Sequence, residues 1–202
     1  IDSNIVSSEQ LNSLNEKGFV IFPPNKIMKD NLKKIKEISE ELIKIEGDKG
    51  GWEGKQEFYK KGKKFEAGAD RLGNLIEKHD VYRKLILLPE MLYCAHEVIK
   101  KDIKIVAAHL RAPTLNSGFQ RIHIDGYPRA KNDDPYTGTI TFVYLDDSTI
   151  ENGALRVVPY SHKKLGWPNE HIDIHKIQED EVNVEVEAGS IVVANLNLWH
   201  GG

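Results

Sequence analysis

Cysteine is almost absent from this chain of 202 residues, because Cys94 is the only one. A single thiol excludes an intrachain disulfide and any zinc or iron–sulfur site built from several thiolates. No apolar run approaches the ~18–20 residues of a membrane-spanning helix, and residues 1–10 lack a signal-peptide pattern. A basic excess is missing too, since 28 Lys+Arg stand against 31 Asp+Glu. We therefore expect a soluble, cytoplasmic protein with no nucleic-acid or membrane partner.

The length suits one domain, because a single core typically serves ~100–200 residues. We predict one domain over residues 1–202, in which residues 1–101 form mostly helical support and residues 102–202 form a β core. The chain opens at Ile1 and stops at Gly202, directly after an apolar run that is typical of a strand. We therefore expect the C-terminal end of the domain to be missing.

Helical signals dominate the first half. Ser7 and Gln10 match a capping box, and Gly18 marks the end of that helix before a short apolar strand at 19–22. Apolar residues recur every three or four positions through residues 28–45, which predicts an amphipathic helix. Further helical patterns cover residues 80–88 and 91–99. Residues 47–69, rich in Gly, Lys and aromatic residues, predict either a surface loop or a lid over a pocket.

After residue 101 the apolar period changes from 3.6 to 2 residues, which is the period of β-strands. Strands are predicted at 103–111, 119–124, 138–145, 154–158, 182–186 and 190–200. Helices followed by many strands favour a mainly β fold with N-terminal helices, such as a jelly roll.

Three residues of the β half have the chemistry of a metal site. His123 and Asp125 are two positions apart on a predicted strand, so both side chains project from the same face. His200 closes a strand whose alternate residues are apolar, which predicts an inward-facing imidazole. Two imidazoles and one carboxylate form the ligand set of non-haem Fe(II), with coordination positions left open.

A second His-x-Asp tripeptide follows at His171 and Asp173, with His175 two residues further on. On a strand these three side chains would also share one face. We interpret this second copy as a polar loop, because it lies between a Trp-Pro pair and the strand predicted at 182–186. The sequence around the first copy favours it as the metal-binding one, since a strand pattern precedes it and a glycine follows it.

Several motifs occur in a specific order along the chain. They are Gly-Phe-Val-Ile-Phe-Pro at 18–23, His-Ile-Asp-Gly at 123–126, Tyr-Leu-Asp-Asp at 144–147, Glu-Asn-Gly-Ala-Leu-Arg-Val-Val-Pro-Tyr-Ser-His at 151–162, Gly-Ser-Ile-Val-Val at 189–193 and Asn-Leu-Trp-His-Gly at 197–201. Together they resemble the phytanoyl-CoA dioxygenase family of Fe(II)/2-oxoglutarate oxygenases over essentially the whole chain. One departure is Tyr160, which stands where the family usually has Gly before Ser-His.

The resemblance implies a double-stranded β-helix, a cupin-like jelly roll, with His123, Asp125 and His200 as iron ligands. It implies Fe(II) as cofactor, 2-oxoglutarate and O2 as co-substrates, and oxidation of an unactivated C–H bond of a small-molecule metabolite with release of succinate and CO2. The aspartate argues against halogenation, in which a small residue replaces the carboxylate. His162 is interpreted as a structural residue or as a residue that supports the metal ligands, because three protein ligands already leave the positions that the co-substrates require.

Contacts to 2-oxoglutarate are less directly indicated. The family's 2-oxoglutarate-binding Arg lies on the strand after the distal His, so we expect it beyond Gly202. Gln120 holds a position three residues before the first ligand that relatives often use, although an odd separation turns it away from the His123 face unless a β-bulge intervenes. Arg111 ends an apolar strand face beside His109, where its fork of donors suits a carboxylate. The alternative for Arg111 is a salt bridge at a sheet edge.

Two other functions stay open from the sequence. One is a catalytically inactive jelly-roll binding module, and the other is a cupin-like metal hydrolase or isomerase that needs no 2-oxoglutarate. The intact ligand set weighs against the inactive module. The polar loop at 126–138, directly after His123 and Asp125, suits a small polar or anionic substrate. Nothing in the sequence indicates an oligomeric state.

Overall fold

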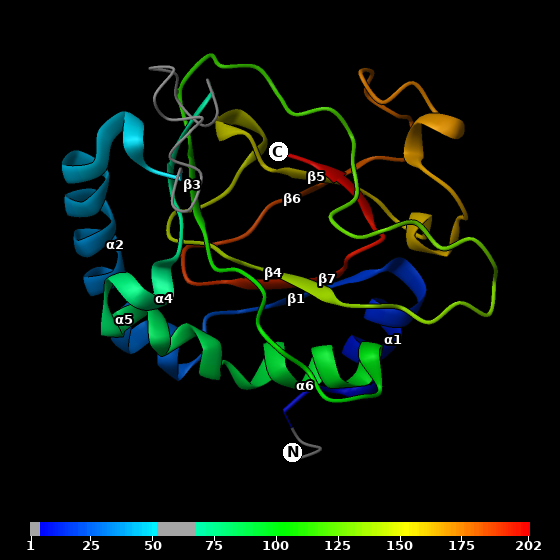
Figure 1. Cartoon of the computed structure of the whole chain (residues 1–202), viewed down its shortest axis with the longest axis horizontal. Helices are drawn as coiled ribbons and strands as arrows, with labels where there is room; N and C mark the ends of the chain where they lie inside the picture. Colours follow the sequence, from blue (N-terminus) through cyan, green and yellow to red (C-terminus); the bar gives the residue numbers. More distant parts are fainter. Residues whose placement is uncertain (1–4, 52–67) are drawn as a thin grey trace. The chain divides into compact units, whose positions relative to one another are not determined.

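The computed structural model describes residues 5–51 and 68–202 (Figure 1). Its contacts divide the chain into two compact units. The first unit comprises Ile1–Lys26, Leu88–Ile103 and Phe119–Gly202, and the second comprises Ile27–Leu87 and Lys104–Gly118. The assignment of residues 1–202 to one domain stays a prediction. Among the described helices, none combines the length and the hydrophobicity that crossing a bilayer requires.

The first unit opens with helix α1 (Ser8–Lys17) and strand β1 (Phe19–Phe22). The predicted capping box is present, because the Ser7 hydroxyl accepts from the Gln10 amide and the Gln10 side chain accepts from the Ser7 amide. Gly18 ends the helix at φ 89°, in the left-handed region that favours glycine. The local signals at both ends of α1 are thus confirmed.

Two antiparallel three-stranded sheets make up the β part of this unit. The first has the order β1-β7-β4 and the second the order β6-β5-β8. Their further strands are β4 (Thr139–Val143), β5 (Leu155–Val158), β6 (Val182–Val184), β7 (Ile191–Asn195) and β8 (Trp199–Gly201). Helices α1 and α6 (Pro89–Ile99) contact β7 of the first sheet. These helices and antiparallel sheets agree with the predicted combination of N-terminal helices and a β region.

One apolar cluster takes residues from both sheets. It is formed by buried side chains of β1, β5, β6, β7 and the residue before β8, namely Phe19, Leu155, Val157, Val184, Val192, Ala194 and Leu198. Alternate residues of one strand point the same way, so Leu155 and Val157 face this cluster while Val158 faces a second one. The second cluster joins Val158 to Ile122 and Trp199. The β6-β5-β8 sheet is therefore apolar on both faces.

Short 3-10 turns connect the strands of the first unit, at Ile150–Asn152, Ser161–Lys163 and Pro168–Glu170. Tyr160, just before the second of these turns, has a φ of 68°. The position therefore requires the left-handed conformation in which glycine is least strained. The glycine that the family usually carries here has a physical reason, and this chain accommodates tyrosine in its place.

The second unit contains helices α2 (Lys26–Glu46), α4 (Leu75–Lys78) and α5 (Asp80–Arg83) with the strands β2 (Ala69–Leu72) and β3 (Leu110–Pro113). It also has 3-10 turns at Gly47–Lys49 and Leu85–Leu87. The hydroxyls of Ser39 and Tyr82 form a buried hydrogen bond of 2.8 Å between α2 and α5. Most of the possible lid at 47–69 lies outside the described residues.

Three strand predictions are wrong in extent. The strand predicted at 119–124 is reduced to an isolated antiparallel bridge between His123 and His200. The strand predicted at 190–200 is split into β7 and β8, which belong to different sheets. The break is a turn in which the Asn195 side-chain oxygen accepts from the Asn197 amide at 2.9 Å and the Asn195 carbonyl accepts from the Leu198 amide. The strand predicted at 103–111 shrinks to β3, and Val106 before it is 85% exposed.

Candidate metal centre

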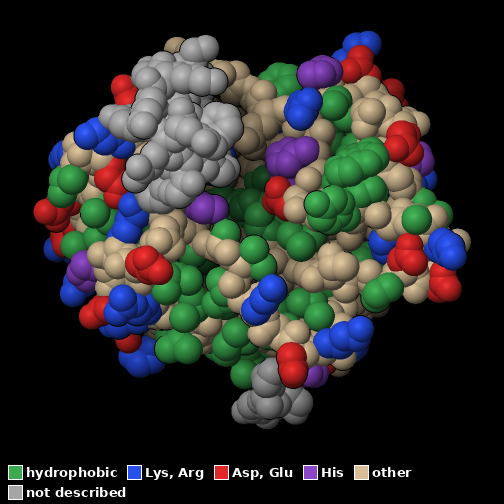
Figure 2. All heavy atoms as spheres, in the orientation of Figure 1, with side chains coloured by type: hydrophobic (Ala, Val, Ile, Leu, Met, Phe, Trp, Pro, Cys, Tyr) green, Lys and Arg blue, Asp and Glu red, His purple; other side chains and the backbone are tan. Residues whose placement is uncertain are grey.

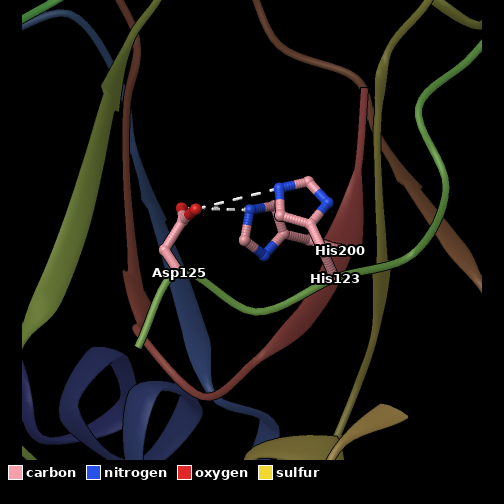
Figure 3. Close-up of side chains that lie close together, drawn as sticks. All are labelled: His123, Asp125 and His200. Carbon is pink, nitrogen blue, oxygen red and sulfur yellow. Dashed lines mark ion pairs between the residues drawn. The ribbon is translucent and has the colours of Figure 1, made fainter. Parts of the chain in front are cut away.

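Three side chains of the first unit meet at one point. His123, Asp125 and His200 each offer a donor atom, and these atoms all lie within 4.8 Å of one another. The Asp125 carboxylate oxygens are 3.8 Å from His123 Nε2 and 3.3 Å from His200 Nε2. Figure 3 shows the carboxylate facing both imidazoles across a narrow gap. The structure therefore brings together the three residues that the sequence predicts as metal ligands.

Backbone pairing places the two imidazoles side by side. His123 and His200 exchange both amide-to-carbonyl hydrogen bonds, at 2.9 and 3.0 Å, in an isolated antiparallel bridge between the segment of His123 and β8. Their ring centroids are 4.5 Å apart. On β5 the partner of His200 is Val157, which belongs to the cluster between the sheets. His200 consequently points to the inner face of its sheet, where the Phe142 ring lies edge-on at 5.8 Å.

Asp125 is held by the turn between β7 and β8. The amides of Asp125 and Gly126 both donate to the Leu196 carbonyl, at 3.1 and 3.2 Å. The Asn197 side chain donates to the Tyr127 carbonyl at 2.8 Å. One short segment therefore fixes the backbone that carries the Asp125 carboxylate, and the same segment leads directly into the strand of His200.

Both imidazoles are oriented by a backbone carbonyl. His123 Nδ1 donates to the Arg121 carbonyl at 3.0 Å, and His200 Nδ1 donates to the Leu198 carbonyl at 2.9 Å. This arrangement leaves Nε2 of each ring as a lone-pair donor, which is what a metal ion requires. Burial lowers the pKa of His123, and the neighbouring His200 lowers it further. The neutral imidazole that binds metal is thus favoured.

The chemistry of this donor set fits a divalent transition metal. Two neutral imidazoles and one carboxylate contribute a single negative charge, so a divalent cation would keep one net positive charge at the site. Imidazole suits iron, copper, nickel and zinc, and the combination of two His with one carboxylate is typical of non-haem Fe(II). His123 and Asp125 are each about one-third exposed, whereas His200 is buried. The site is therefore open to solvent on the side of His123 and Asp125.

The second His-x-Asp copy forms no such cluster among the described residues. His171 Nε2 contacts the Leu165 carbonyl at 2.6 Å, and its ring lies against Trp199. Asp173 caps its own turn by accepting from the His175 amide. These contacts agree with the interpretation of the second copy as a loop.

Gln120 lies beside β8, and its side-chain oxygen accepts from the Gly202 amide at 3.2 Å. The Gln120 amide in turn donates to the Gly202 carbonyl at 2.7 Å. Between this contact and the His123–His200 pair, the chain advances three residues on one side, from Gln120 to His123. On the other side only two residues separate Gly202 from His200. One more residue is thus accommodated on the Gln120 side. We call this offset the bulge, because a β-bulge likewise inserts one extra residue. The assignment of Gln120 to 2-oxoglutarate stays a prediction.

Arg111 lies on β3 in the second unit, where its backbone pairs with Arg71 of β2. Its assignment as a 2-oxoglutarate contact likewise stays a prediction.

The two residues of the Ser-His motif form hydrogen bonds to residues near the site and are not part of the metal-ligand cluster. The Ser161 hydroxyl accepts from the amide of Trp199, the neighbour of His200, at 2.8 Å. His162 Nε2 lies 3.1 Å from the Asn15 carbonyl at the end of α1, and the residue is 1% exposed. His162 therefore has the structural role that was expected, and Ser161 is a supporting residue that the sequence analysis did not single out.

The fold and the site together define a class: an antiparallel β protein with a His-Asp-His centre suited to one metal ion. Residues 14–202 match the family described as phytanoyl-CoA dioxygenase, and the chain belongs to this family. This membership confirms the resemblance seen in the motifs.

A sequence relative and several solved structures are similar to the chain. The iron/alpha-ketoglutarate-dependent dioxygenase ausU of Aspergillus calidoustus is 28% identical over 152 residues, which are 70% of this chain and 48% of that protein. The chain thus spans about half the length of this curated relative. HygX from Streptomyces hygroscopicus, solved with nickel and 2-oxoglutarate bound, has a TM-score of 0.71 at 16% identity and covers 97% of this chain and 80% of its own.

The non-heme alpha ketoglutarate dependent carbocyclase SnoK from nogalamycin biosynthesis has a TM-score of 0.69 at 19% identity. The similarity covers 97% of this chain and 77% of that chain. At these identities the likeness to both structures concerns the fold.

Proposed function

We propose that the protein is an Fe(II)/2-oxoglutarate-dependent dioxygenase that oxidises an unactivated C–H bond of a small-molecule metabolite, on a double-stranded β-helix. The observation that carries the proposal is the convergence of His123, Asp125 and His200, whose donor atoms lie within 4.8 Å of one another. Family membership and the iron or 2-oxoglutarate named for relatives support it.

In this proposal the chain's own residues bind and orient. His123 and His200 would hold iron through Nε2, and Asp125 through its carboxylate. Bound Fe(II) with open positions supplies O2-dependent oxidation coupled to decarboxylation of 2-oxoglutarate to succinate and CO2. The remaining positive charge of the site favours an anionic dicarboxylate. Gln120 and Arg111 are proposed to contact that dicarboxylate.

The apolar cluster formed by both sheets lies beside the site. Phe142 lies edge-on to His200, and Ile140 and Tyr144 pack against the same apolar cluster. Apolar surroundings exclude water and strengthen the electrostatic interactions of the site. A small-molecule substrate agrees with HygX, which has been solved with hygromycin B bound. The substrate of this chain is proposed only as a small molecule with a C–H bond to be oxidised.

The test is anaerobic addition of Fe(II) and 2-oxoglutarate to the full-length protein. We expect the weak visible charge-transfer band of the iron chelate, and its loss in His123→Ala. Admission of O2 should then release succinate in proportion to the 2-oxoglutarate consumed. Absence of the band in the wild-type protein would contradict the proposal and favour a binding module or a hydrolase.

A further inference from the structure

Arg156 of β5 links three segments next to the metal centre. Its guanidinium donates to a Glu181 carboxylate oxygen at 2.8 Å and to the Gln120 carbonyl at 2.7 Å, and it lies 4.5 Å from the centroid of the Phe119 ring. The side chains of Arg156 and Glu181 are only 11% and 4% exposed. This is a buried ion pair in which the other guanidinium nitrogen reaches the backbone of the segment that carries His123.

Burying this ion pair costs free energy of folding. Two charges must leave water, and the mutual attraction of a buried pair often only offsets that cost. Arg156 Nε is also buried, and it has no hydrogen-bond partner among the described residues. A buried group retained at such a cost requires an explanation other than net stability.

The register of the neighbouring strand supplies that explanation. The Gln120 amide donates to the Gly202 carbonyl, whereas His123 pairs with His200, so one extra residue is accommodated between the two pairs. A slip of one residue would exchange the faces of adjacent side chains. Ile122 would then leave its buried cluster, and His123 would turn away from Asp125.

Gly201 shows how closely Arg156 approaches this bulge. The two residues are opposite each other in the β5–β8 register. A Cβ at Gly201 would lie 2.9 Å from the Gln120 carbonyl oxygen and 3.0 Å from Arg156 Nη2. The guanidinium therefore crosses β8 directly after His200 to reach the bulged strand, and only glycine leaves room for it.

We propose that Arg156 is a positioning residue that fixes the bulge between Gln120 and His123 and thereby aims His123 at the metal. The inference rests on the proposed function, since it concerns the same centre. Arginine suits this task because its planar fork can donate to a carboxylate and a carbonyl at once, whereas lysine is a single flexible point charge. Loss of such a supporting contact typically weakens metal affinity by about 10–100-fold.

The experiment measures Co(II) binding by the visible ligand-field absorption of wild type, Arg156→Lys and the double variant Arg156→Met/Glu181→Met. Arg156→Lys keeps a charge beside Glu181 but cannot serve both acceptors. The double variant removes both charges together, which is often neutral for stability, so it covers the case in which the single variant folds poorly. We expect the Co(II) dissociation constant of both to rise about 10–100-fold, with a changed ligand-field spectrum.

The matched control is Lys78→Met, which breaks the part-buried Lys78–Glu46 ion pair of the second unit. It should lower the melting temperature while the Co(II) dissociation constant and spectrum stay as in wild type. Wild-type affinity and spectrum in folded Arg156 variants would overturn the positioning role. Failure of the wild-type protein itself to bind Co(II) would instead count against the proposed function.

Discussion

His123 and His200 form an isolated antiparallel bridge, in which each donates its backbone amide to the carbonyl of the other. This reciprocal pair joins two positions that are far apart in the sequence and sets their rings 4.5 Å apart. Asp125 follows two residues later and is anchored at the Leu196 carbonyl. The geometry of the candidate centre therefore depends on the His123–His200 pair and on the turn at Leu196 that leads into β8.

The two His-x-Asp copies should differ in metal binding. His123→Ala removes one of three converging donors, so we expect loss of measurable Co(II) binding at micromolar metal. His171→Ala should leave the Co(II) affinity within about twofold, because His171 contacts the Leu165 carbonyl and Trp199 rather than the cluster. Equilibrium titration by visible absorption measures both, and the opposite ranking would show that the wrong copy has been assigned.

Gly18 should tolerate no side chain. A Cβ there would lie 2.5 Å from His162 Nδ1 and 2.9 Å from Leu198 Cδ1, at a φ of 89°. We expect Gly18→Ala to lower the free energy of unfolding by about 2–4 kcal/mol, from overpacking and backbone strain together. Urea denaturation followed by circular dichroism measures this change.

Gly153 provides the control for Gly18. Its φ is 94°, but nothing lies within 4 Å of a Cβ built there. Gly153→Ala should therefore lower the free energy of unfolding by only about 1 kcal/mol, from strain alone. Equal losses in the two variants would show that the contact with His162 has no effect.

His162 should make the protein less stable in mild acid. Burial lowers its pKa, with Lys163 and Arg129 acting in the same direction against the hydrogen bond at Asn15 and the charge of Glu16. Below pH ~6.5, the ordinary pKa of histidine, the unfolded chain takes up a proton that the folded protein resists. The free energy of unfolding should then fall as the pH decreases, with a slope of at most about 1.4 kcal/mol per pH unit for this group.

The comparison for this effect is His162→Gln, which keeps an amide donor for the Asn15 carbonyl. Its free energy of unfolding, measured from pH 7.5 to 5.5, should fall less steeply than that of wild type. Parallel curves would mean that His162 does not take up a proton differently in the folded and unfolded states.

Cys94 should be inert in the native protein. The residue is fully buried in α6, and burial raises the pKa of its thiol to about 12, with the charges of Glu90 and Glu97 adding to the effect. Since the thiolate is the reactive form, a disulfide reagent at pH 8 should label the protein only after denaturant is added. Stoichiometric labelling without denaturant, at the rate of a free thiol, would contradict the burial described here.

Local signals in the sequence were sufficient for part of the fold. Ser7, Gln10 and Gly18 define both ends of α1, because capping depends on residues three positions apart and on the left-handed freedom of glycine. The two-residue spacing of His123 and Asp125 predicted that both side chains reach one ion, and their donor atoms do converge with that of His200. The predicted strand face is wrong, because Asp125 lies in a bend and His123 forms only an isolated bridge.

Other features depend on which strands become neighbours, and a single sequence does not show this. The alternation of apolar residues continues through residues 190–200 although the chain turns at Asn195, whose side chain closes the turn. The pattern therefore predicted one strand where the structure has two. The Arg156–Glu181 pair joins β5 to the residue just before its neighbouring strand β6, 25 positions along the chain, and no short-range pattern indicates such a partner. The bulge after Gln120 is defined only against β8, so the parity of Gln120 could not be decided in advance.

The turn from Asn195 to Leu198 has a consequence for how this chain can change in length. The turn carries the chain from the first sheet to the second and leads into His200. Its Leu196 carbonyl accepts hydrogen bonds from the amides of Asp125 and Gly126. An added residue there would displace two of the three donors at once, whereas one added at the exposed tip near Asp133 would displace none. Natural relatives should accordingly vary in loop length at that tip and keep the corner between the sheets at constant length.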